Sequence, residues 1–248
     1  MFVNNNILKI VSSTNLGKMC TPGMINMIQV AGLKNFKAPK DHSDIIIPEK
    51  QKLSIMPRVP ILPPQTKPFK MQKCLRFMMG PEEVHNKLIH KQYGIIALMG
   101  GRLRHGHFEM IRNTLNRKID PKRMFLVYRV DPPWQPLTKK GQGKRMGGGK
   151  GPIDHYVTPI KPNRVIVELA GHCDFEEVKG MLHQVAHILP FKAMAVSHEM
   201  LLEKEAREKL DEDRNINEYT MKYLIQNNMG FVKKWCRKGD YKHFGKYI

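Results

Sequence analysis

The sequence predicts an α+β fold, a two-layer sandwich in which two helices cover a mixed β-sheet, over residues 93–198. Short apolar runs that end at Gly, Pro or Asp recur through this region and indicate buried strands. Two stretches with apolar residues at helical spacing lie between them, in the order β-α-β, long loop, β-β-α-β. Elements in this order are expected to pack as two layers around one core.

The first strand, the first helix and the second strand follow from a change of hydrophobic period. Residues 94–99 are apolar and end at a pair of glycines, as expected for a buried strand. Phe108, Ile111 and Leu115 then recur three and four residues apart, which predicts an amphipathic helix ending near an Asp-Pro pair. The apolar run 124–130 is the second predicted strand.

Two β-rich runs follow the long loop and are separated by a short turn. Residues 155–160 and 164–169 are rich in Val, Ile, Thr and Tyr, which favour strands. The connection between them, residues 161–163, contains Pro and Asn and is typical of a turn. We therefore expect the two runs to pair as an antiparallel hairpin, with Pro159 at a strand end or on an edge.

The second helix has sequence signals at both of its ends. Asp174 followed by Glu177 has the spacing of a capping box, in which both side chains accept hydrogen bonds from backbone amides. An apolar stripe continues from Phe175 to Leu189, and a proline follows at once. Residues 191–197 form the last predicted strand.

The chain before this region divides into two parts of different composition. Residues 1–40 contain five Lys, four Ser or Thr and no acidic residue, which favours a mitochondrial presequence over an ordinary basic tail. Residues 41–92 contain many prolines and cations and predict an extended arm that follows phosphates, with a plain linker as the alternative. The arm cations expected to bind RNA are Lys67, Lys70, Lys73 and Arg76.

Residues 199–248 form a predicted C-terminal extension with two halves. Eight of the 22 acidic residues of the chain lie in residues 199–218, which indicates a solvent-facing helix that avoids RNA. From Lys233 to Lys246 the composition is basic, with Trp235, Tyr241 and Phe244 interspersed. This second half could pack on either RNA or protein.

The charge of the whole chain points to a polyanionic partner. Lys and Arg number 42 against 22 Asp and Glu, which gives a formal net charge of +20. No apolar run approaches the roughly 20 residues needed to cross a bilayer, so nucleic acid is favoured over a membrane. The four cysteines are far apart without a Cys-x-x-Cys pair, so neither a zinc site nor a disulfide framework is expected.

The most distinctive segment lies between Asp131 and Asp154, where no acidic residue occurs. Its centre, residues 139–151, combines five cations with six glycines. Glycine lets backbone amides approach phosphates and adopt positive φ, and the cations neutralise the phosphates that they meet. Its cations are Lys139, Lys140, Lys144, Arg145 and Lys150.

This glycine-rich loop lacks the spacing of a nucleotide-binding loop. In a Gly-x-x-x-x-Gly-Lys-Ser/Thr motif ending at Lys150, the first glycine would fall at Lys144, and Gly151 stands where a hydroxyl is required. The dinucleotide pattern Gly-x-Gly-x-x-Gly started at Gly141 needs glycine at Met146. A phosphate-binding-loop NTPase is therefore the disfavoured alternative.

Other residues with catalytic or metal-binding side chains lack the required partners. His183 and His187 lie four apart on the second predicted helix, but Gln184 occupies the position of the zinc-protease glutamate. A solvated helix face explains them better. His105 and His107 are expected at a helix start, near phosphate. We predict no catalytic residue, no metal and no cofactor.

Several motifs together resemble the universal large-subunit ribosomal protein family number sixteen. They are the strand 94–98 with the basic segment after it, the stretch from Lys144 to Gly151, the pair Tyr156-Val157, and the segment 189–192. The resemblance covers about residues 90–198. Residues 106–110 and 153–159 look like the mitochondrial branch of the family, which favours the presequence and the mitochondrial matrix.

The resemblance implies a non-catalytic rRNA-binding protein whose basic loop reaches the peptidyl transferase centre. Its expected partners are large-subunit rRNA and the A-site and P-site tRNAs, with neighbouring mitochondrial ribosomal proteins on the extensions. Arg145, Met146, Gly147 and Lys150 match the tip that lies near tRNA. An RNA maturation or ribosome-assembly factor is the second alternative. The domain residues expected to bind rRNA are Arg102, Arg104, Lys139, Lys140, Lys144, Arg145 and Lys150.

Overall fold

The computed structural model describes residue 42 and residues 44–245. The predicted presequence, residues 1–40, therefore lies outside the described residues. The elements of the central region are β1 (Tyr93–Ala97), β2 (Gly101–Arg104), α2 (His105–Lys118), β3 (Met124–Tyr128), β4 (Gln135–Thr138), β5 (Ile153–Ile160), β6 (Val165–Gly171), α3 (Phe175–Ile188) and β7 (Ala193–Ser197).

The α+β class is confirmed, but the strands form two antiparallel sheets instead of one mixed sheet. The larger sheet has the order β3-β6-β1-β7, and the smaller one has the order β2-β5-β4. Every strand pair among the described residues is antiparallel. The short strands β2 and β4, which carry no long apolar run, were not predicted from the sequence.

The predicted hairpin between residues 155–160 and 164–169 is wrong, because β5 and β6 belong to different sheets. β5 pairs with β2 and β4, whereas β6 lies between β1 and β3 and is buried along its whole length. The connecting residues do form a turn, in which Asn163 has a φ of +65°. A local turn does not determine which distant strand pairs with the strand that follows it.

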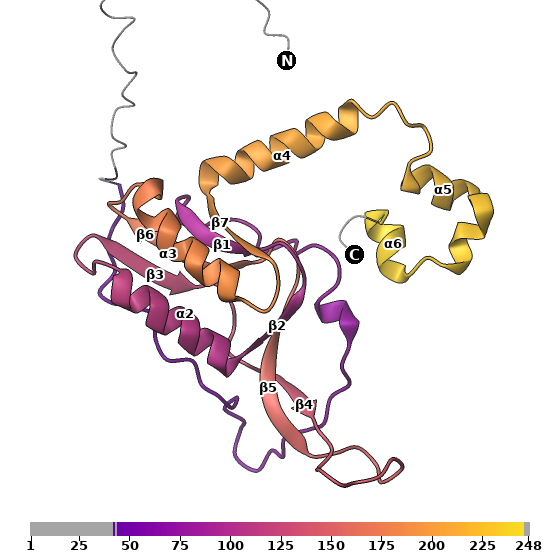
Figure 1. Ribbon diagram of the computed structural model, residues 1–248, viewed down its shortest axis with the longest axis horizontal. Coiled ribbons are helices and arrows are strands. Elements are labelled where there is room, and N and C mark those ends of the chain that lie inside the picture. Colours follow the sequence, from indigo (N-terminus) through magenta and orange to yellow (C-terminus); the bar gives the residue numbers. More distant parts are fainter. Residues whose placement is uncertain (1–41, 43, 246–248) are drawn as a thin grey trace, which may run out of the picture. The chain divides into compact units, whose positions relative to one another are not determined.

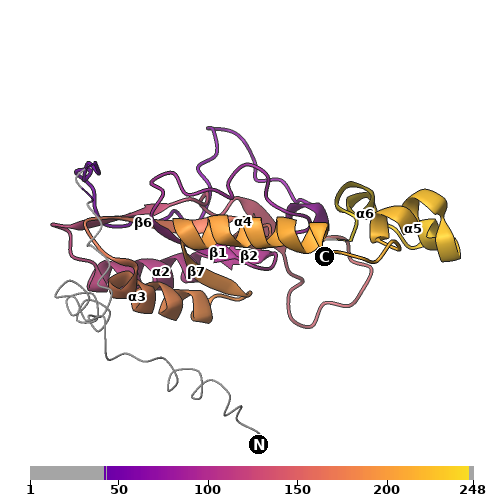
Figure 2. The ribbon, with the colours of Figure 1, turned by 90° about the horizontal axis from the view of Figure 1, so that it is seen from above.

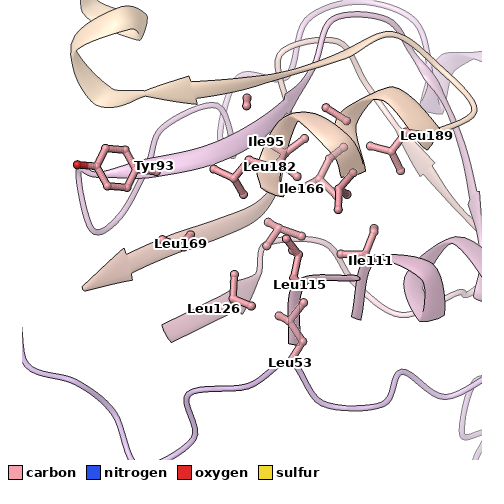
Figure 3. Close-up of a cluster of buried hydrophobic side chains, with 14 of the residues drawn as sticks. Leu53, Tyr93, Ile95, Ile111, Leu115, Leu126, Ile166, Leu169, Leu182 and Leu189 are labelled. Atoms are coloured by element: carbon pink, nitrogen blue, oxygen red, sulfur yellow. The ribbon is translucent and has the colours of Figure 1, made fainter. Parts of the chain in front are cut away.

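Helices α2 and α3 lie side by side on one side of the larger sheet (Figures 1 and 2). The predicted apolar stripe of α2, formed by Phe108, Ile111 and Leu115, is fully buried. Leu182 of α3 joins the same core, together with alternate residues of β1 such as Ile95 (Figure 3). The two helical stripes and the inner face of the sheet thus form one hydrophobic core.

Helix α3 begins after Asp174 as predicted, but the capping box is wrong. The Asp174 side chain makes no capping hydrogen bond. The Glu177 carboxylate instead accepts a hydrogen bond from Arg123, with 2.8 Å between Nη2 and Oε1. A tertiary ion pair has replaced the local contact that the sequence spacing suggested.

The arm that precedes β1 is fastened to the core at Leu53. This side chain is buried beside α2 (Figure 3), and its backbone exchanges two hydrogen bonds with the Asn116 side-chain amide, both 3.0 Å long. In residues 44–92 the described regular structure is a single 3₁₀ turn, η1 (Leu75–Phe77).

The C-terminal extension is helical, with elements α4 (His198–Asp213), α5 (Met221–Asn227), η2 (Met229–Lys234) and α6 (Lys238–His243). The Ser197 hydroxyl caps α4 by accepting a hydrogen bond from the Met200 amide. Leu201 packs on a small cluster that includes Ile96 and Val196. None of the described helices combines the length and apolar character needed to span a membrane.

Candidate nucleic-acid interface

The glycine-rich loop connects β4 to β5, and their antiparallel pairing holds its two ends together. Beyond the last strand pair, the Lys139 amide donates a hydrogen bond to the Pro152 carbonyl, with an N···O distance of 3.2 Å. A Cβ atom on Gly151 would lie only 2.5 Å from the Lys139 carbonyl oxygen. Glycine is therefore required at residue 151 for the loop to close.

Between these ends the backbone is open to solvent. Residues 141–150 are all exposed, and Gly143, Gly147 and Gly149 have positive φ. Because non-glycine residues rarely adopt these angles, the glycines set the path of the loop. The Lys140 ammonium donates a hydrogen bond to the Arg145 carbonyl, at 3.3 Å, and thereby links the first part of the loop to its centre.

The arm and the loop meet through two lysines that lie 80 residues apart in the sequence. The Lys70 ammonium donates to the Lys150 carbonyl at 2.9 Å, and the Lys150 ammonium donates to the Met71 carbonyl at 2.8 Å. Both acceptors are backbone carbonyls without formal charge, so neither contact is an ion pair. The structure thus brings two of the predicted RNA-binding cations together at the base of the loop.

Aromatic contacts add a second connection between arm and loop. The Arg76 guanidinium lies over the Phe77 ring, 5.0 Å from its centroid, and the Phe77 ring packs edge-on against Trp134, just before β4. The remaining predicted arm cations, Lys67 and Lys73, are exposed to solvent, as is Arg76.

A second basic group lies on β2, the neighbour of β5. Arg104 is exposed, whereas Arg102 is half-buried and its Nε atom has no hydrogen-bond partner among the described residues. Arg104 lines a cleft of about 380 Å³ together with Arg58 from the arm. Arg58 was missed from the sequence, where it is one of many arm cations and nothing marks it as a neighbour of Arg104. The remaining lining residues are Val59, His105, Gly106, Asp154, His155 and Tyr156.

The charge of this cleft is modified by Asp154 and His155. The Asp154 carboxylate lies 2.7 Å from Nδ1 of His155, and this hydrogen bond lowers the pKa of Asp154. Asp154 therefore carries a negative charge at neutral pH and offsets part of the positive charge of the two arginines. The cleft is consequently less basic than the open loop.

His105 and His107 lie in the first turn of α2, as predicted. Burial, with a smaller effect of the Arg104 charge, lowers the pKa of His107. Its neutral ring accepts a hydrogen bond at Nδ1 from the Arg104 amide, at 3.0 Å. His107 thus stabilises the helix start and does not add a cation for phosphate.

No group of three or more metal-ligating side chains occurs within the described residues. His183 and His187 are exposed on α3, with their rings stacked 6.5 Å apart. This arrangement corresponds to the solvated helix face that the sequence favoured.

Comparison with known proteins identifies the family. The model of the family described as ribosomal protein L16p/L10e matches residues 63–196, which include the second half of the arm, the loop and both helices. The large ribosomal subunit protein uL16 of Agathobacter rectalis is 34% identical over 131 residues, covering 53% of this chain and 88% of that protein. The predicted resemblance is confirmed, and with it the prediction of a ribosomal protein without enzymatic activity: the chain belongs to the ribosomal protein L16p/L10e family.

Proposed function

We propose that this protein is a structural constituent of the large subunit of the mitochondrial ribosome, where it binds rRNA and extends its glycine-rich loop toward the tRNAs. One observation carries the proposal. In a member of this ribosomal protein family, residues 141–150 are exposed, contain no acidic residue and are anchored at their base by strands β4 and β5 and by the arm.

RNA binding by such a loop would be driven by its charge. Each lysine or arginine that neutralises a phosphate releases condensed counterions, and several such contacts together give strong, salt-dependent binding. The cations proposed for rRNA are those on the loop, Arg102 and Arg104 on β2, and the arm cations Lys67, Lys70, Lys73 and Arg76. The protein holds RNA in place and supplies no acid, base or nucleophile.

The outer part of the loop is the proposed tRNA-proximal region. Met146 is 93% exposed, so its apolar side chain contributes no hydrophobic stabilisation to the fold. Beside a sugar or a base edge, the same side chain would bury apolar surface while Arg145 and Lys150 contact phosphates. Gly147, with a φ of +99°, lets the backbone approach the RNA closely.

A charge-matched pair of variants tests the loop. We expect the triple variant Lys144→Ala, Arg145→Ala, Lys150→Ala to weaken binding to a large-subunit rRNA fragment and to reduce the slope of log K against log salt by about 2–3. The control triple variant Arg207→Ala, Lys209→Ala, Arg214→Ala removes the same charge from exposed positions on or next to the acidic helix α4. Equal slopes for the two variants would refute the role of the loop.

The cellular setting requires a separate experiment. The acid-free composition of residues 1–40 and the motifs at 106–110 and 153–159 support a mitochondrial location. Gradient sedimentation of a mitochondrial lysate should place the protein with mature, translating ribosomes. Sedimentation with immature particles alone would instead identify a ribosome-assembly factor, and exclusion from mitochondria would refute the mitochondrial part of the proposal.

A further inference from the structure

The end of the C-terminal extension carries an unusual concentration of exposed aromatic rings. Residues 219–244, here called the aromatic segment, lie outside the part matched by the family. The segment contains six Lys or Arg residues against one Asp. Its exposed aromatic residues are Tyr219, Tyr223, Phe231, Trp235, Tyr241 and Phe244.

These rings do not form a core of their own. Trp235 is 82% exposed and Phe231 is 67% exposed, whereas Ile225 is the one buried residue of the described segment. An ordinary helical extension would turn its largest apolar side chains inward. Their exposure indicates a surface that is completed by another molecule.

The backbone around Phe231 supports this interpretation. Asn228, Gly230 and Phe231 all have positive φ, with values of +50°, +57° and +56°. A bulky side chain rarely adopts this conformation, and such strain concentrates where a residue serves binding. Here it accompanies an aromatic ring that faces solvent.

Cations lie directly beside the exposed rings. The Lys234 ammonium is 5.2 Å from the centroid of the Phe231 ring, and the Lys222 ammonium is 5.9 Å from that of Phe244. Aromatic faces interleaved with cations are the combination that binds unpaired nucleotides, since bases stack on the rings and phosphates contact the cations.

The acidic helix α4 lies between the central region and the aromatic segment along the chain. Seven of its residues are acidic and three are Lys or Arg, so it repels RNA. Its 16 residues span about 24 Å at 1.5 Å per residue. In the sequence, this acidic stretch therefore divides the aromatic segment from the basic loop.

One ion pair neutralises part of the positive charge of the aromatic segment. The Lys242 ammonium of α6 pairs with the Glu83 carboxylate of the arm. Five of the six Lys and Arg residues of the segment remain for an external ligand. An acidic protein partner would match this charge as well, and aromatic residues are also frequent at protein interfaces. The cations beside the rings of Phe231 and Phe244 favour RNA, because a base can stack on a ring while the adjacent cation contacts its phosphate.

We propose that the aromatic segment is a second RNA-binding site, which takes unpaired nucleotides by stacking on Trp235 and Phe231 while Lys233, Lys234 and Arg237 neutralise their phosphates. The site extends the proposed function to RNA that the loop does not reach. Its ligand class is single-stranded or looped RNA, because bases inside a duplex cannot stack on these rings.

Trp235 provides a direct measurement of this contact. The chain has two tryptophans, so the full-length Trp134→Phe variant leaves Trp235 as the only source of indole fluorescence. Titration with a single-stranded oligoribonucleotide of about 12 nucleotides should quench this emission saturably, as stacking predicts. Duplex RNA of the same length and polyglutamate should quench it at least tenfold less. Absence of quenching by the single-stranded RNA would refute the proposal. Equal quenching by polyglutamate would also refute it and would favour an acidic protein partner.

Further substitutions in the same background locate the site. Phe231→Ala and Lys234→Ala should each weaken the affinity measured at Trp235 about three- to tenfold, while Phe231→Tyr should retain it. Ile216→Ala, at a residue that is 95% exposed but outside the segment, is the control and should have no effect. Circular dichroism verifies that each variant keeps its helices. Equal affinities for Phe231→Ala and Ile216→Ala would contradict the assignment.

The loop triple variant distinguishes this inference from the proposed function. If Lys144→Ala, Arg145→Ala, Lys150→Ala leaves Trp235 quenching unchanged, the aromatic segment binds RNA by itself. If the triple variant abolishes quenching, the aromatic segment does not bind RNA independently of the loop, and the proposal of a second site is refuted. Conversely, a normal salt slope in the triple variant combined with normal quenching would refute the loop function and leave the aromatic segment supported.

Discussion

Glu168 is the most deeply buried acidic residue described in the chain, with 1% of its surface exposed on the central strand β6. Its Oε1 atom accepts a hydrogen bond from the His90 amide at 2.6 Å, and its Oε2 atom lies 3.5 Å from Nε of Arg129. One carboxylate thus joins the end of the arm and the residue after β3 to the middle of the sheet. The hydrogen bond from His90 and the nearby charge of Arg129 offset part of the cost of burying this carboxylate, although Glu168 Oε2 and Arg129 Nε make no hydrogen bond to the described residues.

Replacement of Glu168 tests this connection. Glu168→Ala leaves the Arg129 guanidinium largely buried without its partner and is expected to lower the free energy of unfolding by about 3–5 kcal/mol. Glu177→Gln breaks the exposed pair with Arg123 and should cost less than about 1 kcal/mol. Urea denaturation measures both. Similar losses for the two variants would show that the buried pair has no special importance.

Stability at alkaline pH depends on Cys173. Burial raises the pKa of this thiol to about 12, so the folded chain keeps a proton that the unfolded chain loses above its ordinary pKa of about 8.5. Stability must therefore fall as pH rises from about 8.5, by about 1.4 kcal/mol per pH unit. Burial also raises the pKa of Tyr93 and of Tyr128 to about 12, so these tyrosines contribute only above about pH 10.

Urea denaturation from pH 7 to 10 measures this decline. The Cys173→Ala variant should show a flatter profile between pH 8.5 and 10, because it has no buried thiol to titrate. Cys74→Ala, at a half-buried position, is the matched control and should follow the wild-type profile. A wild-type slope in Cys173→Ala would show that another group causes the loss.

At the scale of elements, the arm acts as a structural part of the domain. Leu53 fills the core beside α2, and the arm accompanies the loop at Lys70 and Lys150. The arm therefore connects the core to the loop through two contacts, one at Leu53 and one at Lys70. Proline between these contacts limits the conformations that the unfolded arm can adopt and lowers the entropy lost on docking.

Asn116 should control the docking of the arm. Asn116→Ala removes both hydrogen bonds to Leu53, and each contributes roughly 1 kcal/mol. We expect amide exchange at Leu53 to accelerate about 10- to 100-fold while the core amides of α2 are unaffected. Asn113→Ala, at an exposed position of the same helix, is the control and should leave Leu53 unchanged. Hydrogen-exchange mass spectrometry makes the comparison, and unchanged protection in Asn116→Ala would contradict it.

At the scale of the whole molecule, α4 contributes to the core as well as carrying the aromatic segment. Leu201 packs on Ile96 and Val196, which lie on strands β1 and β7. The first turn of α4 is thereby part of the domain, and in the next turn the Lys204 ammonium donates a hydrogen bond to Asn163 Oδ1 at 3.3 Å. The boundary between domain and extension falls inside the helix.

Two truncations test this boundary. A chain that ends at Arg214 keeps α4 and should retain the stability of the full chain, apart from a small loss of the exposed Lys242–Glu83 pair. A chain that ends at Ser197 loses Leu201 and should be about 1–3 kcal/mol less stable. Thermal and urea unfolding measure the difference. Equal stability of the two truncated chains would mean that α4 is not part of the domain.

The sequence by itself determined the features that depend on local composition and periodicity. Three such features depend only on residues close together in the sequence. They are the apolar stripe of Phe108, Ile111 and Leu115, the start of α3 after Asp174, and the acid-free loop. The family motif from Lys144 to Gly151 is also contiguous. These features were enough to predict the α+β class and a ribosomal protein.

The tertiary structure alone decided which distant segments meet. It separated β5 from β6, joined Arg58 to the Arg104 cleft, and brought Lys70 to Lys150 across 80 residues. It also redirected Glu177 from a cap to Arg123. These outcomes depend on strand pairing and side-chain packing between segments far apart in the chain, whose free energy is absent from any local pattern of residues.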